Sequence, residues 1–150
     1  MKTLLYGIGN DARQDDGLGI QCAERIESWC RVEGVRGVDI EAGVQLSVED
    51  AATIAAYDRV VFLDASVGGS VDFNFDRIAP EAESSISSHA LSPSDVLGVC
   101  QALYGRSPET YVLHIRGYGF ELGEPMTAEA EGNLRKAVIG LKTFLAGNAG

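Results

Sequence analysis

The stretch LLYGIGNDARQDDGLG, from Leu4 to Gly19, joins an apolar run to a glycine-containing turn that carries three carboxylates. The apolar run is typical of a buried strand. A glycine turn directly after such a strand often binds a phosphate through its backbone N–H groups. Asp11, Asp15 and Asp16 would repel a phosphate, however, so the turn is expected to bind something other than an anion.

The apolar period changes after this turn. Leu18, Cys22, Ile26, Trp29 and Cys30 recur mostly at three- and four-residue steps, which predicts an amphipathic helix that starts near Asp16 and ends before Gly34. Asp15 and Asp16 would lie at the start of this helix, where negative charge suits the helix dipole. The opening of the chain therefore predicts a strand, a turn and a helix.

The same alternation continues to the end of the chain. Further strands are predicted at residues 38–41, 59–64, 71–75 and 111–115. Further helices are predicted at residues 51–57, from Ser92 onward, and from Thr127 to Leu145. The helix that starts at Ser92 has a predicted apolar face of Val96, Cys100 and Leu103. Strands that alternate with helices predict an α/β fold. We expect a three-layer sandwich, with a mostly parallel twisted sheet of about five strands and helices on both faces.

Length and composition narrow the classes of function. The 150 residues predict a single domain, 1–150, and the net charge of −10 argues against nucleic acid and anionic membranes as partners. No apolar run reaches the ~18 residues of a membrane span, and no signal peptide is visible. The three cysteines have no zinc-site spacing and fall in apolar helical patterns, as is typical of a reducing compartment. We expect a cytoplasmic protein.

The candidate site lies where strands end. Ligands of open α/β sheets bind outside the carboxyl ends of the strands. Asp15 and Asp16 follow the first strand, Asp64 closes the strand 59–64, and His89 lies in a serine-rich loop before the next helix. One histidine with two carboxylates is a plausible set of ligands for a divalent metal, with coordination positions left open for water or substrate.

Each of these residues also has a purely structural interpretation. Asp15 or Asp16 could cap the helix, Asp64 could form a turn, and His89 could be hydrogen-bonded in a polar loop. His114, between Leu113 and Ile115, is interpreted as a structural residue within a strand. The pattern Gly7-x-Gly9-x-x-Ala12 also satisfies a loose dinucleotide-binding fingerprint, although the neighbouring carboxylates disfavour a pyrophosphate.

Three motifs in this order resemble one family, the endopeptidases that mature nickel–iron hydrogenases. The first is GIGNDARQDDGLG, the second is the strand RVVFLDAS, and the third is SSHALSPSDVL. The closing segment VLHIRGYGFELGEPMTAEAEGNLRKAV is also similar to the end of that family's sequences. The resemblance covers nearly the whole chain.

The resemblance implies that the protein removes a short C-terminal peptide from the precursor of a hydrogenase large subunit, once nickel has been inserted there. It also implies that Asp16, Asp64 and His89 contact the metal, and that Asp16 and Asp64 are the catalytic residues. Gly9, Asn10 and Asp15 match positions that would hold the turn in place. The nickel would be presented by the substrate, and no organic cofactor is expected.

In a second hypothesis, the same three residues bind nickel but no bond is cleaved. The protein would then be a non-catalytic nickel-binding or chaperone module that docks on the precursor. Two ordinary protease types are disfavoured, because the chain has neither a nucleophile-elbow motif nor a His-Glu-x-x-His helix.

Overall fold

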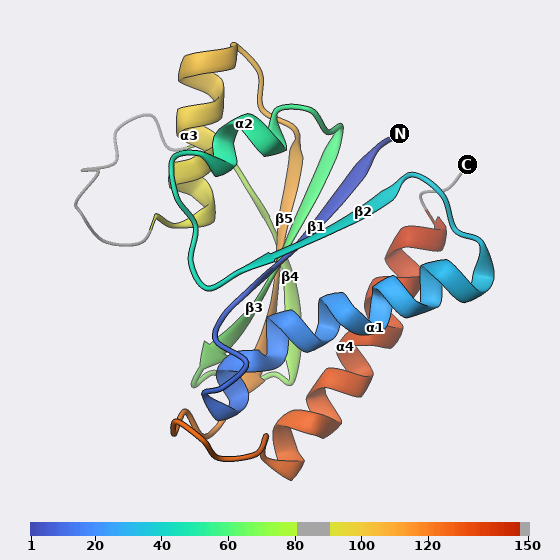
Figure 1. Ribbon diagram of the computed structural model, residues 1–150, viewed down its shortest axis with the longest axis vertical. Helices are drawn as coiled ribbons and strands as arrows, with labels where there is room; N and C mark the ends of the chain where they lie inside the picture. Colours follow the sequence, from blue (N-terminus) through green and yellow to red (C-terminus); the bar gives the residue numbers. More distant parts are fainter. Residues whose placement is uncertain (81–90, 148–150) are drawn as a thin grey trace.

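The structure, a computed structural model, describes residues 1–80 and 91–147. Its elements in chain order are β1 (Thr3–Ile8), the 3-10 turn η1 (Gln14–Gly17), α1 (Leu18–Glu33), β2 (Val38–Gly43), α2 (Asp50–Ile54), β3 (Arg59–Val67), β4 (Phe73–Ile78), α3 (Pro93–Tyr104), β5 (Glu109–Gly117) and α4 (Ala128–Gly147) (Figure 1).

The five strands form one sheet in the order β2-β1-β3-β5-β4. The first four run parallel, and β4 pairs antiparallel with β5 at the edge. The predicted α/β architecture with a mostly parallel sheet is therefore confirmed. Because the parallel strands share one direction, the segments that follow β1, β3 and β5 all leave from the same edge of the sheet.

Helices cover both faces of the sheet, and each face has its own apolar core. One core joins the sheet to α1 and α4 through side chains such as Ile26, Leu134 and Leu141. The other joins the opposite face to α2 and α3 through side chains such as Ile54, Val96 and Leu97. Figure 1 shows α1 and α4 side by side on one side of the strands and α2 and α3 on the other. This is the predicted three-layer sandwich.

Several element boundaries differ from the sequence-based expectations. The helix predicted near Asp16 starts at Leu18, because residues 14–17 form a 3-10 turn instead. The second helix ends at Ile54 rather than Tyr57. The strand expected to end at Asp64 continues to Val67, so Asp64 lies within the pairing between β3 and β5. The edge strand expected at 71–75 spans Phe73–Ile78, after a turn with positive φ at Gly68 and Gly69.

The apolar face predicted for α3 was partly wrong. Val96 and Cys100 are buried, but Leu103 is 65% exposed. The buried face is centred on Val96, Leu97 and Cys100 instead, and Leu103 lies in the last turn before the C-cap at Gly105. The start of α3 was predicted correctly, because Ser92 and Asp95 form a reciprocal capping box.

The three cysteines are free thiols in buried positions, as expected from their apolar surroundings. Among the described residues, no helix combines the length and apolarity that crossing a membrane would require.

Candidate active site

The turn after β1 is held close to the start of α1 by Gly9. Gly9 has a φ of 139°, and a Cβ atom at this position would lie 2.0 Å from the carbonyl oxygen of Asp16. No residue with a side chain fits such an approach. Asn10 then donates its backbone N–H to Oδ2 of Asp16 at 2.8 Å, and its own Oδ1 accepts from the backbone N–H of Ala12. Gly9 and Asn10 thus fix the backbone and the carboxylate of Asp16.

This geometry argues against the dinucleotide hypothesis. A phosphate in the turn would need its backbone N–H groups as donors. The N–H of Asn10 already donates to the Asp16 carboxylate. The negative charge occupies the position at which a phosphate would bind.

Asp15 is directed elsewhere, and its side chain is completely buried. Its carboxylate accepts hydrogen bonds from the backbone N–H groups of Tyr118, Gly119 and Thr127 and from the Thr127 hydroxyl, at 2.7 to 3.0 Å. Burial alone would raise the pKa of Asp15, but these four hydrogen bonds outweigh it and lower the pKa below its ordinary value. Asp15 therefore ties the turn after β1 to the segment between β5 and α4.

The N-terminal end of α1 lies directly against the ends of β1 and β3. A Cβ atom on Gly19 would lie 2.1 Å from the carbonyl oxygen of Leu63 and 2.7 Å from that of Ile8. Only a glycine allows the first turn of α1 to approach both strands this closely. The approach brings the Asp16 turn next to the residue that follows Leu63, which is Asp64.

Asp64 is largely buried, with a strongly perturbed carboxyl group. Its pKa is raised to about 6, mainly by burial, while a backbone hydrogen bond from Ala65 lowers it and the negative charge of Asp16 raises it further. The two carboxylates are therefore near enough to repel each other. Two adjacent oxygen donors of this kind suit a divalent cation, which would remove the repulsion.

A polar row crosses the sheet beside Asp64. Asp64 on β3 is paired with His114 on β5, which is paired with Asn74 on β4. Nε2 of His114 lies 3.2 Å from Oδ2 of Asp76. His114, Asn74, Asp76 and Ser66 help to line a cavity of about 280 Å³, and Gly68 and Gly69 also line it.

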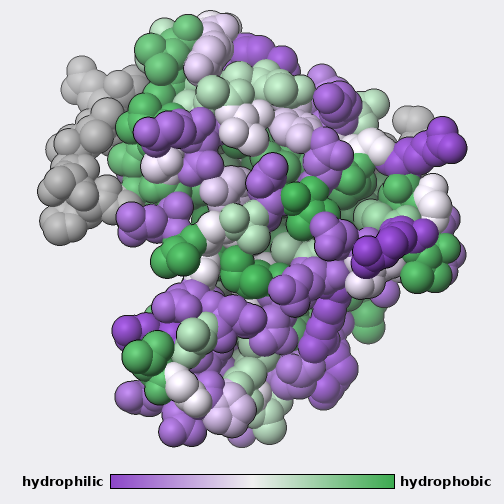
Figure 2. Space-filling view, in the orientation of Figure 1, coloured by the Kyte–Doolittle hydropathy of each residue, from purple (hydrophilic) through white to green (hydrophobic). Residues whose placement is uncertain are grey.

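The sequence predicts His114 as a structural residue within a strand, and the structure places it in β5 with its side chain at this cavity. The usable signal was the alternation of β5, in which His114 lies between the buried Leu113 and Ile115 and so points to the opposite face. Figure 2 shows the molecular surface hollowed on its left side, between the α2–α3 layer and the loops at the carboxyl ends of the strands.

The predicted site residues are thus placed in two groups. The structure brings Asp16 and Asp64 together, with Gly9 and Asn10 supporting Asp16, and it places Asp15 in a separate buried network. His89 lies outside the described residues. Within residues 1–80 and 91–147, no three histidine, cysteine, aspartate or glutamate side chains group closely enough to hold a metal ion.

Comparisons with known proteins agree on the fold. No protein-family model matches the chain, and no curated protein matches its sequence. The chain is similar in structure to the hydrogenase maturating endopeptidase HybD from E. coli, with a TM-score of 0.79, 21% identity, and coverage of 99% of this chain and 94% of that one.

Two further solved structures extend this similarity. The NiFe hydrogenase maturation protease HycI from Thermococcus kodakarensis KOD1 has a TM-score of 0.72 and 22% identity, over 97% of this chain and 92% of that one. The hydrogenase 2 maturation peptidase from Thaumarchaeota archaeon SCGC_AB-539-E09 has a TM-score of 0.69 and 17% identity, over 97% of this chain and 98% of that one. Over nearly its whole length, the chain has the fold of the hydrogenase maturation proteases.

Proposed function

We propose that the protein is an endopeptidase that removes the C-terminal peptide of a nickel–iron hydrogenase large-subunit precursor after nickel insertion. The observation that carries this proposal is the pair of carboxylates, Asp16 and Asp64, at the carboxyl edge of a sheet that shares its fold with maturation proteases. The fold similarity supports the reaction class, and the carboxylate pair supports a divalent metal as part of what is recognised.

In this proposal the nickel belongs to the substrate. Asp16, Asp64 and His89 contact the nickel held by the precursor, and this contact reports that insertion is complete. Gly9, Asn10 and Asp15 hold the Asp16 turn in position. A site with three ligands from the protein leaves coordination positions for the precursor's own ligands. No organic cofactor takes part.

The bond that breaks is the amide between the mature subunit and its C-terminal peptide. The oxygen of a water molecule adds to the scissile carbonyl carbon, and the leaving amine nitrogen gains a proton. Either the nickel assists as a Lewis acid or a carboxylate acts as general base. Three buried free thiols are consistent with action in the reducing cytoplasm.

The test is cleavage of a precursor from the same cell, followed by intact mass. Nickel-loaded precursor should lose its C-terminal peptide, while nickel-free precursor should stay intact. Asp16→Asn should abolish cleavage, and Asp11→Asn is the matched control, because Asp11 is an exposed acid of the same turn. Stable binding of the precursor without cleavage by the parent protein would instead favour the non-catalytic chaperone. Cleavage by Asp16→Asn at the parent rate would remove Asp16 from the mechanism.

A further inference from the structure

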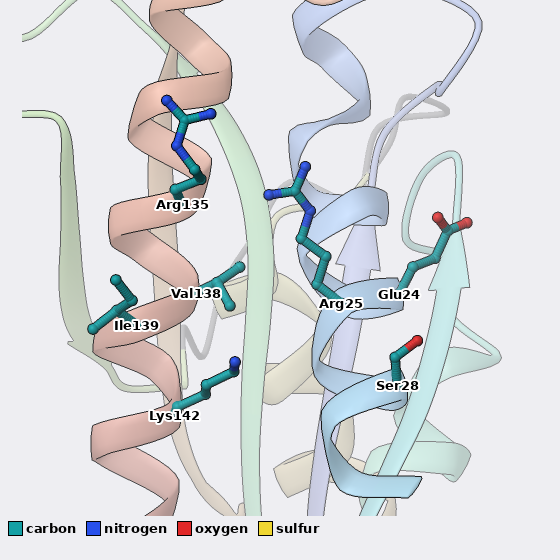
Figure 3. Close-up of a pocket in the computed structure, with 7 residues that line it drawn as sticks. All are labelled: Glu24, Arg25, Ser28, Arg135, Val138, Ile139 and Lys142. Atoms are coloured by element: carbon teal, nitrogen blue, oxygen red, sulfur yellow. The ribbon is translucent and has the colours of Figure 1, made fainter. Parts of the chain in front are cut away.

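A second surface feature lies away from the candidate active site, in the groove between α1 and α4. The groove encloses about 620 Å³. Figure 3 shows Arg25 on α1 facing Arg135, Val138 and Lys142 on α4. None of the candidate active-site residues lines it. The groove is also separated from the candidate active site along α1. Nine residues, the spacing from Asp16 to Arg25, correspond to roughly 14 Å along a helix.

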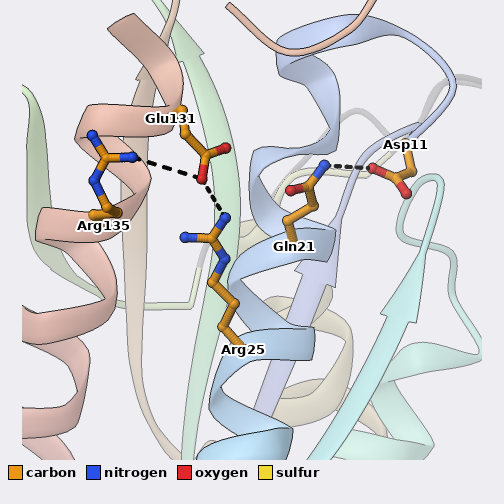
Figure 4. Close-up of polar contacts among 5 residues, drawn as sticks. All are labelled: Asp11, Gln21, Arg25, Glu131 and Arg135. Atoms are coloured by element: carbon orange, nitrogen blue, oxygen red, sulfur yellow. Dashed lines mark hydrogen bonds and ion pairs between the residues drawn. The ribbon is translucent and has the colours of Figure 1, made fainter. Parts of the chain in front are cut away.

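The groove concentrates positive charge on an acidic protein. Arg25, Arg135 and Lys142 line it against one lining carboxylate, that of Glu24, whereas the chain as a whole carries −10. Figure 4 shows the carboxylate of Glu131 between the guanidinium groups of Arg25 and Arg135. Both guanidinium groups approach the same oxygen, Oε1, so most of their N–H donors are left for another acceptor.

The other end of the groove combines a cation with apolar surface. The ammonium group of Lys142 lies 5.7 Å from the centre of the Trp29 ring. Val138 lies between the cations, and Ile139 at the margin is 65% exposed. The groove therefore offers cationic groups at both ends, with an apolar side chain between them.

We propose that this groove docks an acidic segment of the hydrogenase precursor that is separate from the scissile bond. The segment would carry two or more aspartate or glutamate residues around one apolar side chain. This inference rests on the proposed function for the identity of the partner, and on charge complementarity for the chemistry of the segment. Contacts of this kind at the rim of an interface mainly accelerate and orient the encounter.

The experiment uses the full chain and nickel-loaded precursor, with Arg135→Gln, Lys142→Gln and the double variant. The control is Lys136→Gln, an exposed lysine of the same helix whose ammonium group pairs with Asp72. Each single groove variant should raise KM about 5-fold, and the double variant more, with kcat unchanged. Raising the salt concentration should raise KM for the parent protein and much less for the double variant. Lys136→Gln should behave as the parent does.

Direct binding separates this inference from the proposed function. If the parent protein binds the precursor but does not cleave it, the proposed function fails, and weaker binding by the double variant still supports the docking groove. If the parent cleaves and the double variant keeps its KM and salt dependence, the groove has no docking role. An equal rise in KM with Lys136→Gln would also overturn the inference, because the effect would then depend on the net charge of the protein and not on the groove. Absence of both binding and cleavage by the parent would contradict both proposals.

Discussion

Asp15 and Asp16 are neighbours in sequence, but their carboxylates serve two different parts of the structure. Asp15 points into the protein and accepts four hydrogen bonds from the segment between β5 and α4. Asp16 accepts one hydrogen bond from the turn that precedes it and faces Asp64 across the edge of the sheet. Asp15 therefore anchors the segment between β5 and α4 to the turn after β1, whereas Asp16 lies beside Asp64.

The first prediction concerns the anchor. Asp15→Asn should destabilise the protein by about 3 kcal/mol at pH 7, because an amide cannot accept from four donors at once. The folded-state pKa of Asp15 is lowered, so its stabilisation is present above the ordinary carboxyl pKa and is lost as the pH falls through the folded-state value. Urea unfolding at pH 7 and at pH 3 would measure the free energy of unfolding of both proteins. The difference between the variant and the parent protein should be smaller at pH 3.

The matched control for that prediction is Asp11→Asn. Asp11 is exposed, and its Oδ1 accepts one hydrogen bond from Gln21 (Figure 4). Its substitution should change the free energy of unfolding by less than about 0.5 kcal/mol. Equal effects of the two substitutions would contradict the anchoring role of Asp15.

Substitution of Asp64 is expected to change stability in the opposite direction from substitution of Asp15. The pKa of Asp64 is about 6 in the folded protein against 3.8 ordinarily, so the folded state binds this proton more tightly than the unfolded state does. The ionised carboxylate therefore lowers stability above pH 6. Asp64→Asn should raise the free energy of unfolding by at most about 3 kcal/mol at pH 8, and the gain should fade toward pH 4.

The same variant should lose cleavage of nickel-loaded precursor. Thermal unfolding at pH 8 and at pH 4, beside the cleavage assay, would test both consequences. A variant that is less stable than the parent at pH 8 would show that the Asp64 carboxylate contributes to the fold rather than being held there for a ligand.

Much of the fold was predictable because the decisive signals are local. The apolar run before Gly9, the run from Arg59 and the capping sequence at Ser92 each specify an element through nearby residues. The end of β3 was harder to locate, because the chain after Asp64 stays extended through its pairing with β5. Such pairing depends on a partner more than 40 residues away and leaves no local signal.

The placement of two candidate residues at one edge of the sheet was predictable to a similar extent. The acids Asp16 and Asp64 were recognisable because each comes after an apolar run of the sequence, and parallel strands bring such positions to one edge. The different surroundings of Asp15 and Asp16 were not predictable from the sequence. They depend on the hydrogen-bond donors of Tyr118, Gly119 and Thr127, which are distant in the chain. The cavity beside His114 was missed for the same reason, since Asp76 and Asn74 reach it from the antiparallel edge strand.

The third prediction concerns that cavity. Because His114 lines the cavity and is paired with Asp64 in the sheet, the cavity is expected to receive a side chain of the precursor next to the scissile bond. His114→Ala should lower kcat/KM about 10-fold, and Asp76→Asn by a smaller factor, because Asp76 orients the imidazole. Stability should change little, since His114 is partly exposed. A control is Asp39→Asn, a hydrogen-bonded acid on β2 that lies away from the cavity. Unchanged kcat/KM for His114→Ala would exclude the cavity from substrate binding.

The fourth prediction compares two glycines that both have positive φ. Gly9→Ala adds backbone strain and places a methyl group 2.0 Å from the carbonyl oxygen of Asp16, whereas Gly69, with a φ of 98°, has no heavy atom within 4 Å of the added position. Gly9→Ala should therefore destabilise the protein by at least about 3 kcal/mol, against about 1 kcal/mol for Gly69→Ala. Because the collision displaces Asp16, the Gly9 variant should also lose cleavage at temperatures where it is still folded. Circular dichroism melts and the precursor assay at 10 °C would separate the two effects. If the Gly9 variant retained cleavage, Asp16 would not need the position that the turn imposes on it.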